Sequence, residues 1–320
     1  MDVSNHSIKV SVLVMTYNHA KFIRKALDSA LMQKTDFDFE ILISEDCSTD
    51  GTREIVQEYQ QKFPEKIRLL LSEKNIHTNE VVSRGIHAAQ GTYIALLDGD
   101  DYWLSSDKLQ KQVDFLNTHP ECSMCFHNAQ AFNEDSNEEQ WNWTSSNQKE
   151  FSTLEDLWRG NFIATCATMF RNHLITRIPD WYNSFFPITD WPLYVLIAEH
   201  GKIGYLNEVM GAYRLHAGGL YSPYTVKQKL SKTLDFYQRI NRFLDFRYDT
   251  DIKTATSIYF YEWTEEYFKR KEFKSAMDCF KVYLTGRPIN NHISLKKAVK
   301  MGLKLYVLNC LNFLPQKTIK

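Results

Sequence analysis

Three carboxylates stand together at the end of an apolar run, and they have the clearest capacity for chemistry in the chain. The segment Leu96-Leu97-Asp98-Gly99-Asp100-Asp101 follows the β-rich run Thr92–Leu97. Like charges buried together are costly unless a cation lies among them. Oxygen ligands favour hard divalent cations, so Asp98 and Asp100 predict a Mg²⁺ or Mn²⁺ site. Alone, an Asp-x-Asp pair is a weak motif, because acidic clusters at loop starts are commonly solvated turns.

Other polar residues are predicted to reach the same place through alternating strands and helices. Apolar runs predict strands over Ile8–Met15, Phe39–Ile43, Ile67–Leu71 and Thr92–Leu97, with helices over Ala20–Gln33, Gly51–Phe63 and Val81–Gln90. Such strands indicate an α/β fold with a Rossmann-like, mostly parallel sheet covered by helices on both faces. Ligands bind beyond the carboxyl ends of these strands, where Thr16-Tyr17-Asn18, Glu45-Asp46 and Asp98-Gly99-Asp100 fall.

The second half of the chain changes character twice. The polar stretch Asn133–Glu150 predicts a long loop or hairpin, and a helix is expected to open near Asp190. Strands are expected over Thr165–Phe170, Ile203–Leu206 and Val209–Leu215. Beyond residue 222 the apolar spacing is purely helical, over Thr225–Phe246, Asp251–Lys269, Phe273–Leu284 and Ser294–Phe313. The pattern predicts one domain over residues 1–221 and an α-helical extension over residues 222–320.

Composition excludes several classes of protein. The net charge of −1 argues against a dedicated nucleic-acid binder. The six cysteines are scattered, which is typical of reduced, buried thiols in a cytoplasmic protein. Residues 1–9 are polar and do not predict a signal peptide, and no run reaches the roughly 18 apolar residues that span a bilayer. We therefore expect a soluble protein that is at most peripheral to the inner face of the plasma membrane.

The ordered motifs of the first half resemble those of a family 2 glycosyltransferase with a GT-A fold. The matching segments are Val10–Asn18, Ser44–Thr52, Gly91–Trp103 and Lys108-Leu109, and the likeness extends over about the first 220 residues. The resemblance implies an enzyme that moves one sugar from a nucleoside-diphosphate sugar to an acceptor hydroxyl, with Mn²⁺ or Mg²⁺ as cofactor and inversion at the anomeric carbon. Processive relatives carry a Gln-x-x-Arg-Trp motif and membrane spans; their absence favours a single addition per encounter.

The resemblance also implies roles for particular residues. Asp46 would accept hydrogen bonds from the base, and Asp100 would be the principal metal ligand, with Asp98 on the metal or the ribose. For Arg84 a place facing the nucleotide and a surface salt bridge are both open. The implied contacts to the nucleotide sugar from the first half are Thr16, Tyr17, Asn18, Glu45, Asp46, Arg84, Asp98 and Gly99.

Three further site residues are implied in the second half. Asp190 matches the position of the catalytic base, although the family commonly has two adjacent acids there and this chain has Thr189 before Asp190. Tyr213-Arg214-Leu215-His216 matches a segment that returns to the active site. Arg214 would then offset the charge of the leaving diphosphate, and His216 would be a metal ligand beside Asp98 and Asp100.

Several partners and alternatives stay open. We expect a UDP-sugar donor and a glycan or lipid-linked glycan acceptor, in the assembly of a bacterial surface polysaccharide such as O-antigen or capsule, or of a glycoconjugate. A sugar nucleotidyltransferase is the first alternative, but Thr16–Phe22 is not the Gly-rich, basic loop that would hold a triphosphate. A catalytically inactive nucleotide-sugar-binding module is the second. The basic amphipathic segment Ser294–Lys320 fits peripheral membrane contact, packing on its own domain, or a homodimer through the C-terminal helices.

Overall fold

A computed structural model of the 320-residue chain describes residues 7–135, 140–175, 177–185, 187–220, 224–286 and 293–312. The chain divides into two compact units, Met1–Leu157 with Phe162–Pro223, and Trp158–Asn161 with Tyr224–Lys320. The predicted boundary after residue 221 lies outside the described residues. The short segment Trp158–Asn161 belongs to the second unit, although the sequence assigned it to the first domain.

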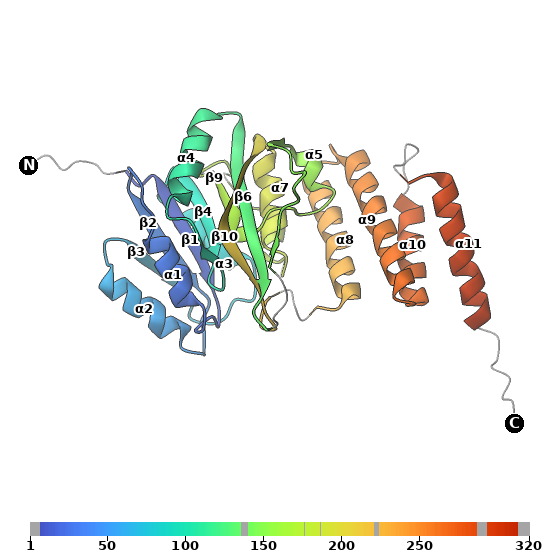
Figure 1. Cartoon of the computed structure of the whole chain (residues 1–320), viewed down its shortest axis with the longest axis horizontal. Coiled ribbons are helices and arrows are strands. Elements are labelled where there is room, and N and C mark those ends of the chain that lie inside the picture. Colours follow the sequence, from blue (N-terminus) through green and yellow to red (C-terminus); the bar gives the residue numbers. More distant parts are fainter. Residues whose placement is uncertain are drawn as a thin grey trace, which may run out of the picture. The chain divides into compact units, whose positions relative to one another are not determined.

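One sheet organises the first unit (Figure 1). Its spatial order in the described residues is β3-β2-β1-β4-β9-β6-β10-β5, with β7 paired to β6 and β8 to β10. The strands are β1 (Val10–Thr16), β2 (Phe39–Glu45), β3 (Ile67–Leu71), β4 (Tyr93–Asp98), β5 (Tyr102–Trp103), β6 (Cys122–Asn133), β7 (Trp141–Asn142), β8 (Phe151–Ser152), β9 (Thr168–Arg171) and β10 (Lys202–Leu215). Strands β1 to β4 lie where the sequence predicted them, so the α/β GT-A architecture is confirmed.

The parallel half of the sheet aligns three strand ends. Strand β1 pairs in parallel with β2 and with β4, and β3 pairs in parallel with β2. Thr16 is opposite Glu45, and Met15 is opposite Asp98. The residues that follow these strands therefore emerge at one edge of the sheet, as the strand pattern predicted.

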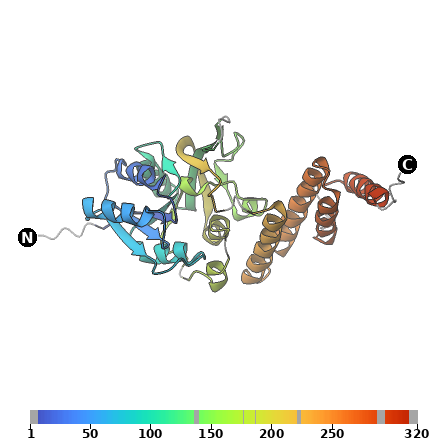
Figure 2. The same cartoon turned by 90° about the horizontal axis from the view of Figure 1, so that it is seen from below.

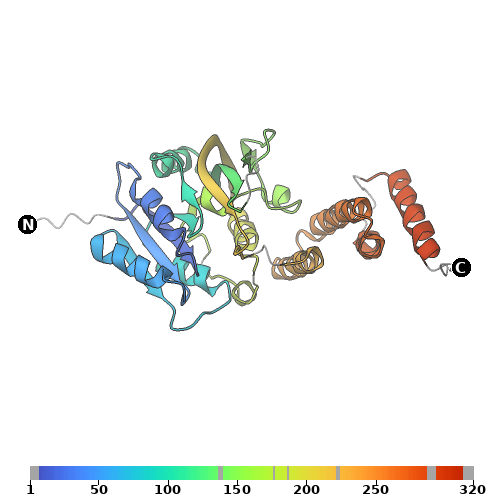
Figure 3. The same cartoon turned by 60° about the horizontal axis from the view of Figure 1, so that its bottom comes forward.

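Helices of the first unit connect and cover these strands. They are α1 (Ile23–Leu31), α2 (Thr52–Lys62), α3 (Glu80–Ala88), α4 (Lys108–Thr118), α5 (Leu154–Leu157), the 3₁₀ turn η1 (Thr165–Ala167), α6 (Asp180–Asn183) and α7 (Asp190–Ala198). The connections β1–β2 and β2–β3 step in one direction and β3–β4 reverses, so right-handed crossovers set α1 and α2 on one face and α3 on the other. Figure 3 shows these blue and cyan elements around the N-terminal strands.

The second half of the sheet is mixed, and two predicted elements differ there. Strand β9 runs antiparallel between β4 and β6. The predicted strand Thr165–Phe170 begins as the turn η1, and only its end joins β9. The predicted strands Ile203–Leu206 and Val209–Leu215 are one strand, β10, because bulges absorb the polar residues between them instead of ending the pairing with β6.

The second unit is helical, as predicted (Figure 2). Its helices are α8 (Val226–Phe243), α9 (Asp249–Lys269), α10 (Phe273–Gly286) and α11 (Leu295–Asn312). A capping box in which Thr225 and Gln228 exchange hydrogen bonds starts α8. The core between α9, α10 and α11 is largely aromatic and includes Phe260, Tyr261, Tyr267, Phe280 and Tyr283. The end of the predicted segment Ser294–Lys320, residues 313–320, lies outside the described residues.

Among the helices that the structure describes, none combines the length and the apolar character needed to cross a bilayer.

Candidate active site

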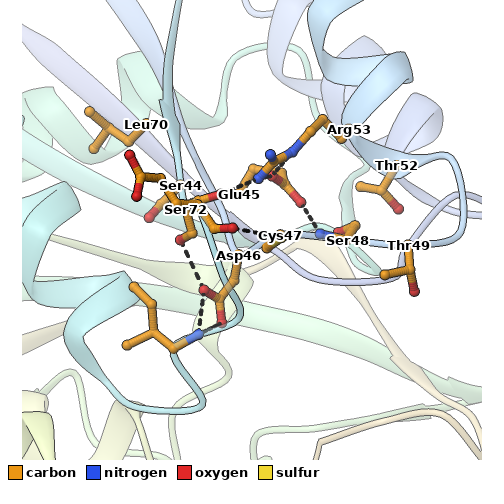
Figure 4. A network of polar contacts seen from close by, with 12 residues as sticks. Ser44, Glu45, Asp46, Cys47, Ser48, Thr49, Thr52, Arg53, Leu70 and Ser72 are labelled. Atoms are coloured by element: carbon orange, nitrogen blue, oxygen red, sulfur yellow. Dashed lines mark hydrogen bonds and ion pairs between the residues drawn. The ribbon is translucent and has the colours of Figure 1, made fainter.

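Asp46, directly after β2, is buried and anchored by hydrogen bonds from the chain beyond β3. The Ser72 hydroxyl donates to Asp46 Oδ1 at 2.9 Å, and the Ile76 backbone N–H lies 3.0 Å from Oδ1 and 3.2 Å from Oδ2. Figure 4 shows Ser72 and Asp46 joined in this way. The carboxylate thus stands at the strand edge in a fixed orientation, with acceptor capacity beyond these bonds.

Glu45, the last residue of β2, has both carboxylate oxygens engaged by protein groups. Its side chain is fully buried, Oε1 accepts from the Ser48 backbone N–H at 2.5 Å, and Oε2 accepts from Arg53 Nε at 2.6 Å. Arg53 also donates to the Ser72 carbonyl. Figure 4 shows Arg53 beside Glu45. This ion pair ties the start of α2 to the end of β2, so both Glu45 oxygens help to hold these two elements together.

Arg84 projects from α3 beneath the same edge. Its Nε donates to Ser44 Oγ at 2.8 Å and one terminal nitrogen donates to Ser72 Oγ at 2.7 Å. The other terminal nitrogen donates to the carbonyls of Glu45 and Leu70, at 2.9 and 3.1 Å. Arg84 is therefore neither a surface salt bridge nor an open guanidinium: it joins the ends of β2 and β3.

The loop after β1 is held to the loop after β2. The Asn18 amide oxygen accepts from the Thr49 backbone N–H at 2.9 Å, and the Asn18 N–H donates to Ser48 Oγ at 2.9 Å. Asn18 has φ of 55°, a left-handed conformation that asparagine tolerates. Tyr17 is 37% exposed and its ring approaches the His77 ring edge-on at 6.2 Å. Tyr17 is thus an available aromatic face, and Asn18 shapes the loop that presents it.

Gly99 allows the turn after β4 to pass close to the loop after β1. A Cβ at this position would lie 2.7 Å from Thr16 Oγ1 and 2.8 Å from His19 Nδ1, and both contacts are too short for real atoms. The Gly99 N–H also donates to the Met15 carbonyl at 2.8 Å. Any larger residue would force the Thr16 and His19 side chains, or the turn itself, to shift.

Two imidazoles converge on Asp100. His216 Nε2, after β10, lies 3.0 Å from Asp100 Oδ2, and His19 Nε2, after β1, lies 3.6 Å from the same oxygen. Burial alone raises the pKa of Asp100, but the two histidines outweigh it and lower the pKa. Burial lowers the pKa of His19 in spite of the adjacent Asp100. The structure therefore brings Asp100 and His216 together, and it adds His19, which the sequence analysis did not single out.

Arg214 lies behind this pair and supports it. Its Nε donates to the Asp100 carbonyl at 2.8 Å, its backbone N–H donates to Asp101 Oδ1 at 2.8 Å, and its guanidinium pairs with Glu134. The guanidinium also stacks on Phe22, 4.5 Å from the ring centre. Its side chain is only 6% exposed, so Arg214 fixes the Asp98–Asp101 turn from within.

Asp190 brings a further negative charge to the end of β4. It begins α7, and its Oδ1 accepts from the Trp191 N–H at 2.7 Å. Burial, then the charges of Asp100 and Asp190, raise the pKa of Asp98 to about 8. Burial, followed by Asp100 and Asp98, also raises the pKa of Asp101 well above its usual range. Burial is the largest cause of both shifts, and the charges of neighbouring carboxylates add to it, with Asp190 among them for Asp98.

The residues at the end of β4 suit a divalent cation. Carboxylate and imidazole groups are acceptable ligands for Mn²⁺, and carboxylates for Mg²⁺. The described residues contain no group of three His, Cys, Asp or Glu side chains already arranged as ligands. Mg²⁺ commonly takes only one or two protein carboxylates and completes its shell with substrate phosphates and water. The closely placed carboxyl groups of Asp98 and Asp100, the first with its pKa raised by burial and by the second, are the observation that fits such a cation.

Two residues that support the site, Asn79 and His19, were not predicted from the sequence. The partners of Asn79 are far from it in the chain. Asn79, at the start of α3, donates to the carbonyls of Phe185 and Ile188 at 2.5 and 2.9 Å. It thereby holds the segment that leads into Asp190. Nothing in the local sequence around Asn79 signals this bond, whereas His19, three residues after Thr16, could have been found as a polar residue in the same loop.

Comparison with known proteins identifies the family to which this architecture belongs. The family model described as Glycosyl transferase family 2 matches residues 11–177, more than half of the chain. An uncharacterized protein of Mycobacterium tuberculosis is 36% identical over 225 residues, which cover 70% of this chain and 64% of that protein. The chain thus spans less than two thirds of that relative's length.

Two solved structures share the fold. TarS 1-349 of Staphylococcus aureus in complex with UDP-GlcNAc aligns with a TM-score of 0.55 at 18% identity, over 90% of this chain and 95% of that one. The mannosyltransferase PcManGT from Pyrobaculum calidifontis, in complex with GDP-Man and Mn²⁺, aligns with a TM-score of 0.55 at 15% identity, over 95% of this chain and 81% of that one. The chain belongs to glycosyl transferase family 2.

Proposed function

We propose that this enzyme is a metal-dependent, inverting glycosyltransferase that moves one sugar from a nucleoside-diphosphate sugar to an acceptor hydroxyl. The observation that carries the proposal is the convergence of Asp98, Asp100 and Asp190 at one strand edge, with the pKa of Asp98 raised to about 8. Carboxyl groups crowded in a partly buried site ionise more readily with a cation beside them, and a metal-bound diphosphate brings one.

In this proposal the nucleotide lies over the ends of β1 and β2. Asp46 accepts hydrogen bonds from the base, and Thr16 and Tyr17 line the pocket beside it. Its support is that Asp46 is held in orientation by Ser72 and Ile76 and that Tyr17 presents an exposed ring. The family resemblance implies nucleotide contacts for Asn18, Glu45 and Arg84, but in this proposal they act through the loops and strand ends that they hold.

The metal is proposed to be held by Asp100 and His216, with Asp98 and the adjacent Gly99 backbone beside the ribose or the metal. Mn²⁺ or Mg²⁺ there would supply positive charge for the departing diphosphate. Arg214, already bound to Glu134 and the Asp100 carbonyl, positions this turn. These bonds leave Arg214 a positioning role in place of the direct diphosphate contact that the resemblance implies.

Asp190 is proposed as the general base. Its carboxylate removes the proton from the acceptor hydroxyl as the oxygen forms its bond to the anomeric carbon and the bond to the diphosphate breaks. Attack from the face opposite the leaving group inverts the configuration. The position supports this role, since Asp190 starts α7 while acting electrostatically on Asp98.

We propose a UDP-sugar as donor, because the TarS structure with the same fold binds UDP-GlcNAc. A GDP-sugar is the competing donor, since PcManGT binds GDP-Man. TarS is named a poly(ribitol-phosphate) β-N-acetylglucosaminyltransferase and is 32% identical over 115 residues, 35% of this chain and 19% of TarS. This likeness supports an acceptor that is a glycan or lipid-linked glycan of a bacterial surface polymer, with the enzyme in the cytoplasm.

A donor panel tests the proposal. The purified chain is incubated with UDP-, dTDP- and GDP-sugars, with and without Mn²⁺, and release of nucleoside diphosphate is measured. Metal-dependent release with one donor is expected, and the anomeric configuration of the product, read by NMR, is expected to be inverted. Release of pyrophosphate from a sugar phosphate and a nucleoside triphosphate would instead indicate a nucleotidyltransferase. Binding of a donor without turnover across acceptors would indicate an inactive binding module.

A further inference from the structure

Helix α11 has a second apolar face that no residue described in the structure covers. On one side Ala298, Met301 and Leu305 are at most 9% exposed and join the core with α10. On the other side five large apolar residues are at least 51% exposed; they are Leu295, Val299, Leu303, Tyr306 and Val307. Leu295, Val299, Leu303 and Tyr306 follow one another at helical spacing, so they form a continuous strip along the helix. We call these five residues the exposed stripe.

A row of lysines runs beside the exposed stripe. Lys296, Lys300 and Lys304 are exposed and recur every four residues, each one position after a residue of the stripe. Helix α11 contains no aspartate or glutamate between Leu295 and Asn312. This local excess of positive charge stands out in a chain whose net charge is −1.

The remaining lysine of α11, Lys297, has an acidic partner. Lys297 Nζ lies 3.0 Å from the Glu265 carboxylate of α9 and 5.1 Å from the centre of the Tyr261 ring. Lys297 is about 150° or more around the helix from the stripe residues Leu295 and Val299, at 100° per residue. The acidic group of α9 therefore neutralises Lys297 and lies away from the exposed stripe.

The stripe continues into a shallow apolar groove. Leu303, Lys304 and Val307 line it together with Phe268 of α9. The Lys304 ammonium lies 5.5 Å from the centre of the Phe268 ring, so its stem covers apolar surface while its charge remains at the rim. The apolar surface is thus wider than a single helix edge and keeps its basic border.

We propose that the exposed stripe and its lysine row bind an anionic phospholipid surface, with α11 lying in the plane of the interface. Exposed leucine and valine enter the acyl boundary, Tyr306 suits the headgroup level, and the lysines meet the lipid phosphates. A second copy of α11 carries the same lysines and no acid, so it offers them no complementary charge. The inference rests on the helical unit alone and does not depend on the proposed function.

Vesicle sedimentation of the full chain tests the inference. Wild-type protein is expected to sediment with vesicles that contain phosphatidylglycerol, to stay in solution with pure phosphatidylcholine, and to dissociate as salt is raised. Hydrogen exchange of the same protein is expected to slow over residues 295–307 when phosphatidylglycerol vesicles are added. Absence of binding to these vesicles would overturn the inference.

Two variants separate the two parts of the surface. Lys296→Glu with Lys300→Glu is expected to lower the partition coefficient by about tenfold or more, because each lysine near an anionic surface contributes on the order of 1 kcal/mol. Leu295→Glu with Val299→Glu is expected to abolish binding by putting charge into the apolar stripe. All four positions are exposed, so both variants are expected to keep the wild-type circular dichroism spectrum and melting temperature.

Matched controls lie on the neighbouring helix. Lys274→Glu with Lys281→Glu makes the same charge change on α10, and Leu284→Glu charges a leucine that is 51% exposed there. Both controls are expected to bind like the wild type. If the Lys274/Lys281 control lost as much vesicle binding as the Lys296/Lys300 variant, the loss would come from the change in net charge alone. That result would contradict binding through a defined surface on α11. A wild-type dimer in solution that Leu295→Glu with Val299→Glu converts to monomer would show that a second copy covers the stripe and would overturn the lipid assignment.

Discussion

Two acidic clusters meet at the carboxyl edge of the same sheet, and they differ in how their charge is balanced. At the ends of β2 and β3, Glu45 is paired with Arg53, and Arg84 is enclosed by hydroxyls and carbonyls. At the end of β4, the imidazoles of His19 and His216 lie on the Asp100 carboxylate and Arg214 donates to the Asp100 carbonyl, while burial and then the charges of Asp100 and Asp190 raise the pKa of Asp98 to about 8. A satisfied cluster holds the fold, whereas a cluster of crowded carboxyl groups is where a cationic ligand is expected.

Removing the proposed base should have the largest effect on activity. Asp190→Asn keeps the hydrogen bond to the Trp191 N–H but cannot accept a proton, so we expect turnover to fall by about 10³-fold. Donor affinity, measured by calorimetry, should stay within about threefold, because the base touches the acceptor side. Asp180→Asn, an exposed acid at the start of α6, is the matched control and should retain activity. Near-wild-type turnover by Asp190→Asn would place the base elsewhere.

Neutralising the metal-binding carboxylate should come next. Asp100→Asn is expected to weaken Mn²⁺ binding, followed by electron paramagnetic resonance in the presence of nucleoside diphosphate, by at least about tenfold. Chelation of the metal should suppress turnover of the wild type to a similar level, since both remove the charge that balances the diphosphate. The exposed Asp114→Asn on α4 should change neither. Unaltered Mn²⁺ binding by Asp100→Asn would show that the metal does not bind at this cluster.

A change in the charge-balanced cluster around Glu45 should lower the stability of the fold. Glu45→Gln leaves Arg53 without its anion in a partly buried position, and we expect the free energy of unfolding to fall by about 2 kcal/mol in urea titrations. Glu58→Gln removes an anion from Arg24 on the surface and should change stability little, because solvent screens that pair. If Glu45→Gln instead lost donor affinity with unchanged stability, Glu45 would contact the donor, and the assignment of a purely structural role to its cluster would be wrong.

The smallest expected effect is a pH-dependent gain in stability, in contrast to the loss expected for Glu45→Gln. A raised pKa means that folded Asp98 holds a proton which the unfolded chain has released, so metal-free protein loses stability as pH rises from about 4 toward 8. Asp98→Asn removes this penalty, and its stability relative to the wild type should grow over that window. Thermal melts in chelator at several pH values measure the difference. A constant difference across the window would show that folding does not raise the pKa of Asp98.

The backbone of this site was predictable because apolar runs mark parallel strands and their ends must meet at one edge. The positions of Thr16, Glu45 and Asp98 at the ends of neighbouring strands could therefore be predicted from the sequence. The partners of Glu45, Arg84 and Arg214 were not predictable in the same way. Each is decided by groups brought in by folding, such as the Leu70 carbonyl for Arg84.

The same distinction explains the second half of the sheet. Asn207 and Glu208 interrupt the apolar pattern, which predicted two strands, but β10 continues through them because its bulges keep it paired with β6. Whether a polar interruption ends a strand depends on the neighbouring strand, which a single sequence does not reveal.

The segment Trp158–Asn161 has a practical consequence for dissecting the enzyme. Trp158 is 1% exposed, its carbonyl accepts from the Tyr237 hydroxyl, and its ring lies 5.8 Å from that of Tyr248. A protease cut near residue 223 would leave this tryptophan on the first fragment while its partners stay on the second. The two fragments should then remain associated or the first should aggregate, so the catalytic unit cannot be released by a single scission.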